Sequence, residues 1–599
     1  MAQDIRPTQY VTTFGPGAII ETPTGPFLLR STDAVIQQLH HNQVRPSKFE
    51  INDLRLQRGI LNGGRVFRIP DENLEKGFSH PTKAFPYWNL CVKTHKENVN
   101  VIHRRSDGCP KCMGQNREDS KKPMFAIRFV SACPQGHLSD VNWSWVIHRD
   151  SPSPCTHSEF FLWHGTGSSL SSIEIQCPQC NIRKTLGDIY QLKQNCSGYY
   201  PERESDREQC SQKATVIQRG ANQIRIPEVI TSLTIPPARA IHNVLQREGF
   251  TPLFTSLSAL GATESNFQLL LQEFVKKHHI SEMTRDAILQ YSFEEISEAY
   301  QELEDSVQKK TMIEYLIQEH RALEYAAESG YPPHPSESER RAGEPPRFQV
   351  NSVEIKPTLY TGSKKIPFRI MPIARLRTVL VQKAYRRVDF DDLSIPATEV
   401  AGIDSDNPGV LWYPGVDHFG EGIFIDIDTE TLKKKFYPSS SRAVQWDTAL
   451  NQRPPAVSIT EDLVEWNALT IWWHTLAHRL INAVSIHSGY SSTSIRERVY
   501  FTSDEKRGSR GAILLYTTQA GGDGTMGGLT SLVPQFEEIF RLALETSDNC
   551  SNDPLCFDAE LDLNLNLGSA CYSCAMVSET SCEHRNGYID RKLLLENMP

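Results

Sequence analysis

The sequence predicts a multidomain α+β fold with a β-rich N-terminal half, a helical middle and a mixed α/β C-terminal half. The chain has 599 residues, and because one core rarely serves more than about 250–300, about three to five domains are expected. Apolar residues recur at three- and four-residue steps between positions 264 and 328, whereas short β-like runs with turn signals dominate elsewhere. Fourteen cysteines gather in two stretches, one in the N-terminal half and one near the C-terminal end.

Local composition divides the chain into five expected segments. The first carries β-like runs between turn signals such as Gly15-Pro16-Gly17. The helical pattern includes Phe267, Leu270 and Leu271, and a Pro-rich stretch follows it. The segments are a β-rich N-terminal segment (1–85), a cysteine-rich region (86–215), a helical region with a Pro-rich linker (216–347), a mixed α/β segment (348–460) and a C-terminal segment (461–599) that opens with a helix and ends in a second cysteine cluster.

The overall composition narrows the class of protein. With 39% hydrophobic and 23% charged residues, the chain is typical of soluble globular proteins. The first residues, MAQDIRPTQY, contain no apolar leader, and no run approaches the roughly 18 apolar residues of a membrane span. We therefore expect a cytoplasmic protein that does not bind membranes. The formal charge of −9 excludes a globally basic nucleic-acid coat, but a local basic stripe remains compatible with it.

The cysteine spacing indicates metal sites, because Cys-x2-Cys pairs in a reducing cytoplasm are more often metal ligands than disulfide halves. Cys177-x2-Cys180, followed by Cys196 and Cys210, predicts one closed four-thiolate zinc site. Such a site leaves no open coordination position, so its ion would be structural. The alternative is four unpaired core cysteines.

A second site is expected upstream, where Cys109-x2-Cys112 follows the Cys-x3-His pair Cys91 and His95. For the remaining residues of this region, a buried thiol with hydrogen-bonded imidazoles is as compatible with the sequence as metal ligation. These residues are Cys133, His137, His148 and Cys155.

The C-terminal cluster predicts a third site formed by Cys556, Cys571, Cys574 and Cys582, with Cys550 as a bystander and no metal as the alternative. In total we expect two to three structural Zn²⁺ ions. Zinc sites of this kind contribute roughly 10–16 kcal/mol of apparent folding free energy in small finger peptides, so each would stabilise its own module.

Motifs that resemble catalytic sites are incomplete. His474 and His478 share a helix face at i and i+4, but Thr475 stands where a zinc protease carries its glutamate base. The Gly-rich stretch 520–528 lacks the lysine of a phosphate-binding loop. No Walker box or DEAD-type acid pair is found, so we expect a non-enzymatic protein. The alternative from another class is a metal-dependent hydrolase that uses His474, His478 and an acid from elsewhere.

A run of basic residues predicts a DNA-binding stripe. Nine Lys and Arg residues and one acid, Glu354, lie between Ser352 and Val388, and phosphate binding needs such a local excess. Tyr360, Phe368 and Tyr385 are available for stacking on bases. The alternative is a solvated face or one that pairs with an acidic partner. The predicted contacts are Lys364, Lys365, Arg369, Arg375, Arg377, Lys383, Arg386 and Arg387.

Several stretches resemble the DrmB family, the accessory subunits of the DISARM anti-phage defence systems. They include TQYVTTFGPGAII, ACPQGHLSDVNWSWVIH, LLYTTQAGGDGTMGGL and GSACYSCAMVSETSCEHRNGYIDRKLLL. The tail is similar to the four-cysteine zinc domain of MrfA-type helicases, which implies the ligands Cys556, Cys571, Cys574 and Cys582. One departure is His95, which stands near where the family pattern would have a cysteine.

The resemblance implies a complex with a DrmA-like helicase subunit, DNA binding by that complex, and a role in phage restriction. The expected function is therefore a non-catalytic, DNA-binding partner of a helicase. A pure protein-interaction scaffold without DNA contact is a further alternative.

Overall fold

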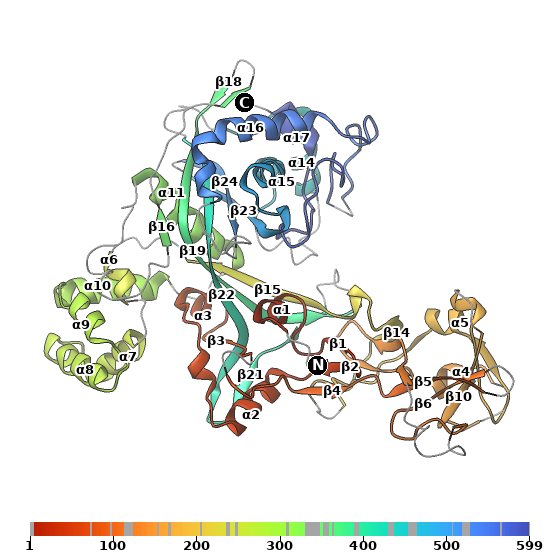
Figure 1. The fold of residues 1–599 in the computed structure, drawn as a ribbon. Helices are drawn as coiled ribbons and strands as arrows, with labels where there is room; N and C mark the ends of the chain where they lie inside the picture. Colours follow the sequence, from red (N-terminus) through yellow and green to blue (C-terminus); the bar gives the residue numbers. More distant parts are fainter. Residues whose placement is uncertain are drawn as a thin grey trace. The chain divides into compact units, whose positions relative to one another are not determined.

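The structure is a computed structural model that forms two compact units (Figure 1). Unit 1 comprises residues 1–51, 64–230 and 380–416, and unit 2 comprises residues 52–63, 231–379 and 417–599. The structure describes residues 5–71, 75–95, 99–112, 124–151, 155–165, 169–203, 207–234, 240–245, 249–306, 311–329, 348–350, 359–361, 364–388, 395–428, 436–452, 464–505, 507–517, 528–563 and 566–597. The expected Pro-rich linker and most of the Gly-rich stretch 520–528 lie outside these residues.

Unit 1 is built mainly from short strands in three sheets, in the orders β1-β2-β4, β12-β11-β10-β6-β5-β7 and β13-β14-β8-β9. Its strands are β1 (Ile19–Thr22), β2 (Gly25–Leu29), β3 (Arg65–Arg68), β4 (Thr82–Ala84), β5 (Trp88–His95), β6 (Val99–Arg104), β7 (Met124–Ala126), β8 (Phe129–Ala132), β9 (Leu138–Asp140), β10 (Phe160–His164), β11 (Glu174–Gln176), β12 (Arg183–Thr185), β13 (Lys193–Asn195), β14 (Lys213–Gln218), β20 (Thr398–Glu399) and β21 (Gly402–Asp404). Its helices are α1 (Pro7–Thr12), α2 (Thr32–His41), α4 (Trp143–His148) and α5 (Leu186–Gln191), with 3₁₀ turns at Pro46–Phe49, Leu170–Ser172 and Asn222–Ile224.

The six-stranded sheet of unit 1 has a small core. Trp88, Phe161 and Ile175 from the strands pack with Trp143 of α4. Helix α4 begins where the Asn142 side chain accepts a hydrogen bond from the backbone N–H of Trp145. Strands of three to eight residues bury little apolar surface, so further cross-links would add stability to this region.

Unit 2 combines a helical part with a second α/β part. The helical part contains α3 (Leu54–Gly59), α6 (Ala240–Leu245), α7 (Phe250–Leu260), α8 (Glu264–Lys276), α9 (Glu282–Ile288), α10 (Phe293–Ser306) and α11 (Met312–Ser329). The α/β part contains β16 (Phe348–Val350), β17 (Leu359–Thr361), β18 (Lys364–Ile366), β23 (Ile495–Asp504), β24 (Gly508–Thr517), α14 (Ser441–Asn451), α15 (Ala468–Ser488), α16 (Phe536–Glu545) and α17 (Arg591–Glu596), with 3₁₀ turns at Ser492–Ser494, Thr530–Gln535 and Thr546–Asp548. The strands β15 (Ile226–Leu233), β19 (Phe368–Arg386) and β22 (Asn407–Ile427) contribute residues to both units.

Helix α15 is the centre of the α/β part of unit 2, with β23 and β24 beside it and α14, α16 and α17 around it (Figure 1). The Asn467 side chain caps its N-terminus, and Gly489 ends it with a left-handed φ of 74°. Nearly every residue from 468 to 484 is buried, as expected for a helix enclosed on all sides. Gly511 of β24 allows the close approach of the Trp473 ring, since a Cβ there would lie 2.1 Å from its Cδ1 atom.

The expected fold class is confirmed, because the structure combines helices and sheets, a cysteine-rich N-terminal half and a C-terminal four-cysteine module. The expected segment boundaries remain predictions. Among the described residues, no helix has the length and apolar character needed to cross a lipid bilayer.

Candidate metal centres

All fourteen cysteines lie in five groups of metal-ligating side chains. In each group, the candidate ligand atoms lie within 4.8 Å of one another. Tetrahedral zinc with bonds of about 2.3 Å to sulfur and about 2.0 Å to nitrogen separates two sulfurs by about 3.8 Å, and a sulfur from a nitrogen by about 3.5 Å. A disulfide would instead bring two sulfurs to about 2.05 Å. These separations therefore test whether the residues fit zinc.

The Cys91 group contains Cys91, His95, Cys109 and Cys112, which the sequence predicted as one site. Cys91 and His95 come from β5, and the two later cysteines follow β6. The Cys91 and Cys112 sulfurs are 3.8 Å apart, and His95 Nε2 lies 3.5 Å from Cys91 Sγ and 3.4 Å from Cys109 Sγ. The backbone N–H of Cys112 donates to the carbonyl of Cys109 at 3.0 Å, which forms the tight turn that points both thiols the same way. The separations fit tetrahedral zinc.

The Cys133 group contains Cys133, His137, Cys196 and Cys210. Cys133 Sγ lies 3.3 Å from Cys196 Sγ and 3.3 Å from His137 Nδ1. Gly136, with a φ of 89°, closes the turn between Cys133 and His137. The hydrogen bond from Cys133 lowers the pKa of the Cys196 thiol to about 4, and the thiolate is the form that binds metals.

The Cys155 group contains His148, Cys155, Cys177 and Cys180. Cys155 and Cys177 place their sulfurs 3.9 Å apart. His148 ends α4, and its Nδ1 donates to the Ser144 carbonyl at 2.7 Å. Its Nε2 is buried and has no hydrogen-bond partner among the described residues. A backbone acceptor on one ring nitrogen, with the other nitrogen free, is the usual arrangement of a metal-binding histidine.

The expected grouping of Cys177, Cys180, Cys196 and Cys210 is therefore wrong. The structure divides this set into two pairs, and each pair joins a histidine-containing partner set instead. Cys177 and Cys180 lie in the turn between β11 and β12 of the six-stranded sheet, whereas Cys196 and Cys210 lie in the connection between β13 and β14 of the four-stranded sheet. The sequence offered a signal, since Cys133 and His137 repeat the Cys-x3-His spacing of Cys91 and His95.

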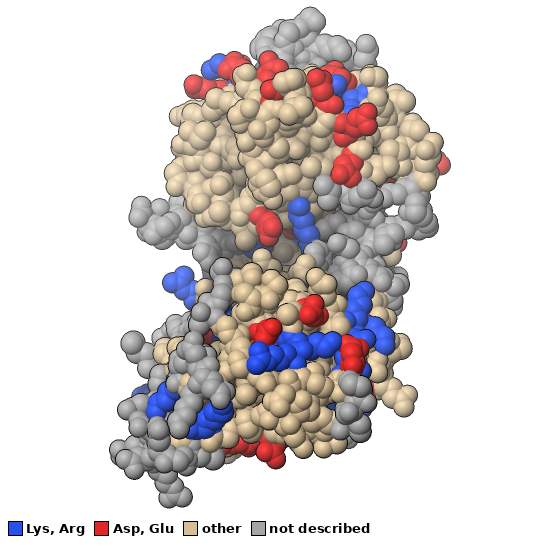
Figure 2. All heavy atoms as spheres, turned by 90° about the vertical axis from the view of Figure 1, so that its right-hand side faces the viewer, with Lys and Arg blue, Asp and Glu red and all other residues tan. Residues whose placement is uncertain are grey.

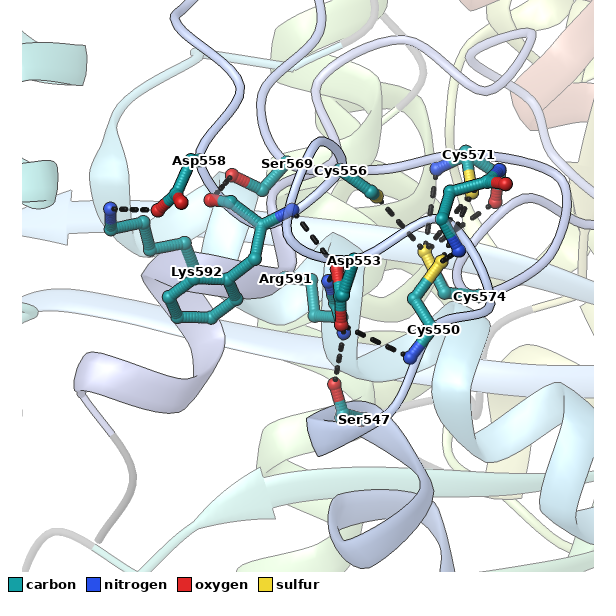
Figure 3. A network of polar contacts seen from close by, with 12 residues as sticks. Ser547, Cys550, Asp553, Cys556, Asp558, Ser569, Cys571, Cys574, Arg591 and Lys592 are labelled. Atoms are coloured by element: carbon teal, nitrogen blue, oxygen red, sulfur yellow. Dashed lines mark hydrogen bonds and ion pairs between the residues drawn. The ribbon is translucent and has the colours of Figure 1, made fainter.

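The Cys550 group contains Cys550, Cys556, Cys571 and Cys574 (Figure 3). The sulfurs of Cys556 and Cys571 each lie 3.7 Å from Cys574 Sγ, and Cys550 Sγ lies 3.4 Å from Cys571 Sγ. Burial opposes ionisation of Cys571, but hydrogen bonds from Cys550 and Asn552 lower its thiol pKa to about 6. The group is a four-thiolate set whose separations fit zinc.

A buried arginine supports the loop of the Cys550 group. Arg591 of α17 forms an ion pair with Asp553 and donates to the Ser547 carbonyl at 3.2 Å (Figure 3). The other carboxylate oxygen of Asp553 accepts the backbone N–H of Cys550 at 3.2 Å. Such contacts orient ligands from outside the coordination sphere.

The expected C-terminal set requires a correction, because Cys550 belongs to the four-thiolate group and Cys582 does not. Cys582 Sγ instead lies 3.4 Å from His474 Nε2. It accepts hydrogen bonds from the backbone N–H groups of His584 and Asn586, at 3.3 Å each, which orient it away from the other cysteines. Counting five cysteines for four positions could not reveal a partner on a distant helix.

The His474 group contains His474, His478, Glu497 and Cys582, all buried. Glu497 Oε1 lies 2.7 Å from His474 Nε2 and 3.1 Å from His478 Nε2. Burial alone would raise the pKa of Glu497, but the two imidazoles lower it below its usual range. Glu497 is an acid near the histidine pair, as the hydrolase alternative requires, and no spacing in the sequence indicates it. His474, His478 and Glu497 have no solvent-exposed surface.

The predicted DNA-binding stripe is wrong as a surface feature, because most of its arginines are buried in β19. Arg369 pairs with Asp426, and Arg386 donates to Glu228 at 2.6 Å. Arg377 donates to Asp417 at 3.2 Å and to the Asn52 carbonyl at 2.9 Å. These guanidinium groups already have carboxylate or carbonyl partners.

The other members of the stripe do not restore it. Arg387 has no exposed surface, and Arg375 is partly buried over the Phe419 ring, where burial lowers its pKa. Lys383 alone on β19 is partly exposed without a side-chain partner in the described structure, and the side chains of Lys364 and Lys365 lie outside the described residues. The expected stacking residues Phe368 and Tyr385 are buried, and the side chain of Tyr360 lies outside the described residues. On the face in Figure 2, the described Lys and Arg side chains form a short row in the lower half, with Asp and Glu beside it, and lie apart elsewhere.

Two family models match parts of the chain. "Domain of unknown function (DUF8724)" matches residues 6–226 and so covers the Cys91, Cys133 and Cys155 groups. "MrfA Zn-binding domain" matches residues 476–575, which include the whole Cys550 group but neither His474 nor Cys582.

Two known proteins are similar to the chain. The "DISARM protein DrmB" of Bacillus paralicheniformis is 28% identical over 548 residues, which are 86% of this chain and 89% of that protein. A solved structure, "Crystal Structure of DUF1998 helicase MrfA bound to DNA", aligns with 43% of this chain and 26% of its own at 12% identity, with a TM-score of 0.21 that supports no structural inference. The resemblance to DrmB along most of the chain, and to the MrfA zinc-binding domain near its C-terminal end, is therefore confirmed.

Proposed function

We propose that this chain is a non-catalytic subunit of a DISARM phage-defence complex, held in shape by zinc, that assists a DrmA-like helicase in engaging foreign DNA in the cytoplasm. The similarity to DrmB over 86% of the chain carries the proposal. The arginines of β19 are not proposed as DNA contacts, because their partners lie within the protein.

The chemistry of the groups supports a structural role for the metals. Each cysteine-rich group supplies four protein donors, which complete a tetrahedron and leave no position for a reacting water. Thiolates and imidazoles are donors that suit zinc. We propose that zinc occupies the Cys91, Cys133, Cys155 and Cys550 groups, which raises the number of these ions from the expected two to three to four.

The proposal is tested by co-expressing the full chain with the helicase subunit of its own defence system. We expect a stable complex in which the helicase hydrolyses ATP and the complex binds DNA, while the chain alone has no turnover. ATP hydrolysis by the isolated chain would overturn the proposal. Nuclease or peptidase turnover that disappears in His474→Ala would favour the hydrolase alternative, and a complex that never binds DNA would favour a pure interaction scaffold.

A variant pair tests whether the Cys550 group supports complex formation. Cys550→Ser combined with Cys556→Ser removes two of its four thiolates. Ser573→Ala is the matched control, since Ser573 lies in the same turn and is exposed. We expect the double variant to lose one zinc per chain and to recover less helicase, and the control to behave as the wild type.

A further inference from the structure

The His474 group lies at the junction of three elements of unit 2. His474 and His478 occupy one face of α15, Glu497 lies on β23, and Cys582 lies in the segment before α17. Neither His474 nor Cys582 lies within residues 476–575, which match the zinc-binding domain. The ligand atoms also belong to a different set from the Cys550 group.

The hydrogen bonds of the two imidazoles leave two ring lone pairs facing a carboxylate oxygen. His474 Nδ1 faces the Tyr588 carbonyl at 3.1 Å, and His478 Nδ1 faces the Ala575 carbonyl at 2.8 Å. A carbonyl oxygen only accepts, so each Nδ1 carries the proton and each neutral ring presents its Nε2 lone pair. Both lone pairs then face the same carboxylate oxygen, Glu497 Oε1, at 2.7 and 3.1 Å. Acceptors facing one another repel unless something positive lies between them.

Extra protons resolve this contact poorly. A proton on Glu497 Oε1 could be donated to only one of the two Nε2 atoms, so the second ring would depend on the thiol of Cys582, whose sulfur lies 3.4 Å from His474 Nε2 and is only a weak donor. Two imidazolium rings beside the Glu497 carboxylate and a neutral Cys582 thiol would leave a net positive charge where the histidines and Glu497 have no exposed surface. If Cys582 also ionised, four charged groups would lie in that interior. An uncompensated charge is strongly disfavoured in such an interior.

A divalent cation resolves the contact and balances the charge. One Zn²⁺ with a carboxylate, a thiolate and two neutral imidazoles is electrically neutral, which suits a buried site. The 3.4 Å separation of His474 Nε2 from Cys582 Sγ is close to the about 3.5 Å of two such ligands on tetrahedral zinc. Two backbone N–H groups donate to Cys582 Sγ and stabilise its thiolate form.

We infer that His474, His478, Glu497 and Cys582 bind a further structural Zn²⁺ ion that joins α15, β23 and the C-terminal segment. The backbone carbonyls at both Nδ1 atoms hold the rings in the tautomer that zinc requires. Four protein donors complete the coordination, and the burial of the group excludes solvent. This site is independent of whether the chain binds a helicase.

The test compares zinc content in full-length protein purified anaerobically without chelator. Glu497→Gln removes the ligand charge at nearly constant size and should lower the zinc content by one ion per chain relative to the wild type. His320→Gln is the matched control, because His320 is also buried in unit 2 and its ring hydrogen-bonds Thr502. It should leave the zinc content unchanged. A folded Glu497→Gln protein with wild-type zinc content would overturn the inference.

A second measurement needs no variant. In crystals of the wild-type chain, an anomalous difference map recorded at the zinc absorption edge should show a peak between the two Nε2 atoms and Cys582 Sγ. A map with peaks in the four cysteine-rich groups and none at this position would overturn the inference, even if Glu497→Gln failed to fold.

Discussion

Arg387→Ala is expected to destabilise unit 1 rather than to remove a DNA contact. The Arg387 side chain is completely buried, and its three nitrogen atoms each donate to a different backbone carbonyl. The acceptors are Gly136 at 2.9 Å, Ile224 at 2.6 Å and Gly17 at 2.9 Å. One guanidinium therefore connects three segments that are far apart in the sequence, and its removal leaves three carbonyls without that donor.

The contacts of Arg387 set the size of the effect. A hydrogen bond to a charged group contributes about 1.5–3 kcal/mol, so three independent bonds would contribute about 4.5–9 kcal/mol. Bonds from one guanidinium are not independent, and disrupting a buried charged contact commonly costs about 3–5 kcal/mol. We expect a loss of about 4 kcal/mol in the free energy of unfolding, which is a large share of the stability of an ordinary domain.

Lys383→Ala is the matched control, because Lys383 lies on β19 only four residues before Arg387, carries the same charge and is partly exposed. Proteolysis at increasing urea concentrations measures stability, and we expect the control to lose about 1 kcal/mol or less. Fluorescence anisotropy of the helicase complex with labelled DNA, across a salt series, measures phosphate contacts. Each lost contact would lower the salt slope by about 1. An Arg387→Ala protein of wild-type stability, whose complex has a lower salt slope, would refute the reasoning.

Three further perturbations test other parts of the structure. Removing metal with a strong chelator at pH 7 under reducing conditions should make residues 86–215 sensitive to protease, because zinc sites contribute roughly 10–16 kcal/mol to the folding of small modules; a zinc-free protein that still resists protease would contradict this. Burial lowers the pKa of His320 to about 3, so below about pH 6.5 the unfolded chain takes up a proton that the folded chain does not. The folded state therefore loses stability as the pH falls, by about 2 kcal/mol at pH 5. Urea unfolding at pH 7 and pH 5 should show this loss in the wild type but not in His320→Gln, and equal losses in both would contradict it. Asp590→Asn should lower the free energy of unfolding by about 3 kcal/mol in thermal or urea unfolding, because Asp590 accepts hydrogen bonds from Arg442 Nε at 2.6 Å and Trp446 Nε1 at 2.7 Å. Glu596→Gln, at an exposed position of α17, the helix that Asp590 caps, should cost little. Equal effects of the two variants would argue against the role of Asp590.

Most residues of the candidate metal groups can be found from the sequence, but their pairing cannot. Spacing finds a knuckle, because two thiols on one tight turn are neighbours in any fold. Which knuckles meet depends on strand order. Cys133 follows β8, Cys196 follows β13 and Cys210 precedes β14. The strand order β13-β14-β8 brings these strand ends together at one end of the sheet. Without that order, spacing alone groups Cys177, Cys180, Cys196 and Cys210 as one site.

The arginines of β19 show a second limit of sequence reasoning. A local excess of positive charge indicates a surface only if the side chains reach solvent, and most of β19 is buried. The carboxylates that neutralise its arginines come from distant positions, such as Asp426 for Arg369 and Glu228 for Arg386. The apolar residues between the charges, Ile370, Leu376 and Val379 among them, are buried, and such residues in the sequence indicate a strand that packs in the core.

The His474 group shows how burial decides between chemistry and architecture for one set of residues. Two histidines at i and i+4 with a nearby glutamate are the parts of a zinc hydrolase, but a catalytic zinc keeps one position for water, and its glutamate lies beside that water. Here Glu497 contacts both imidazoles directly, and Cys582 lies against His474 Nε2. Both contacts lie where the histidines and Glu497 have no exposed surface. A hydrolase would require Cys582 to withdraw and a solvent path to open, so the same residues favour an ion that holds the fold together.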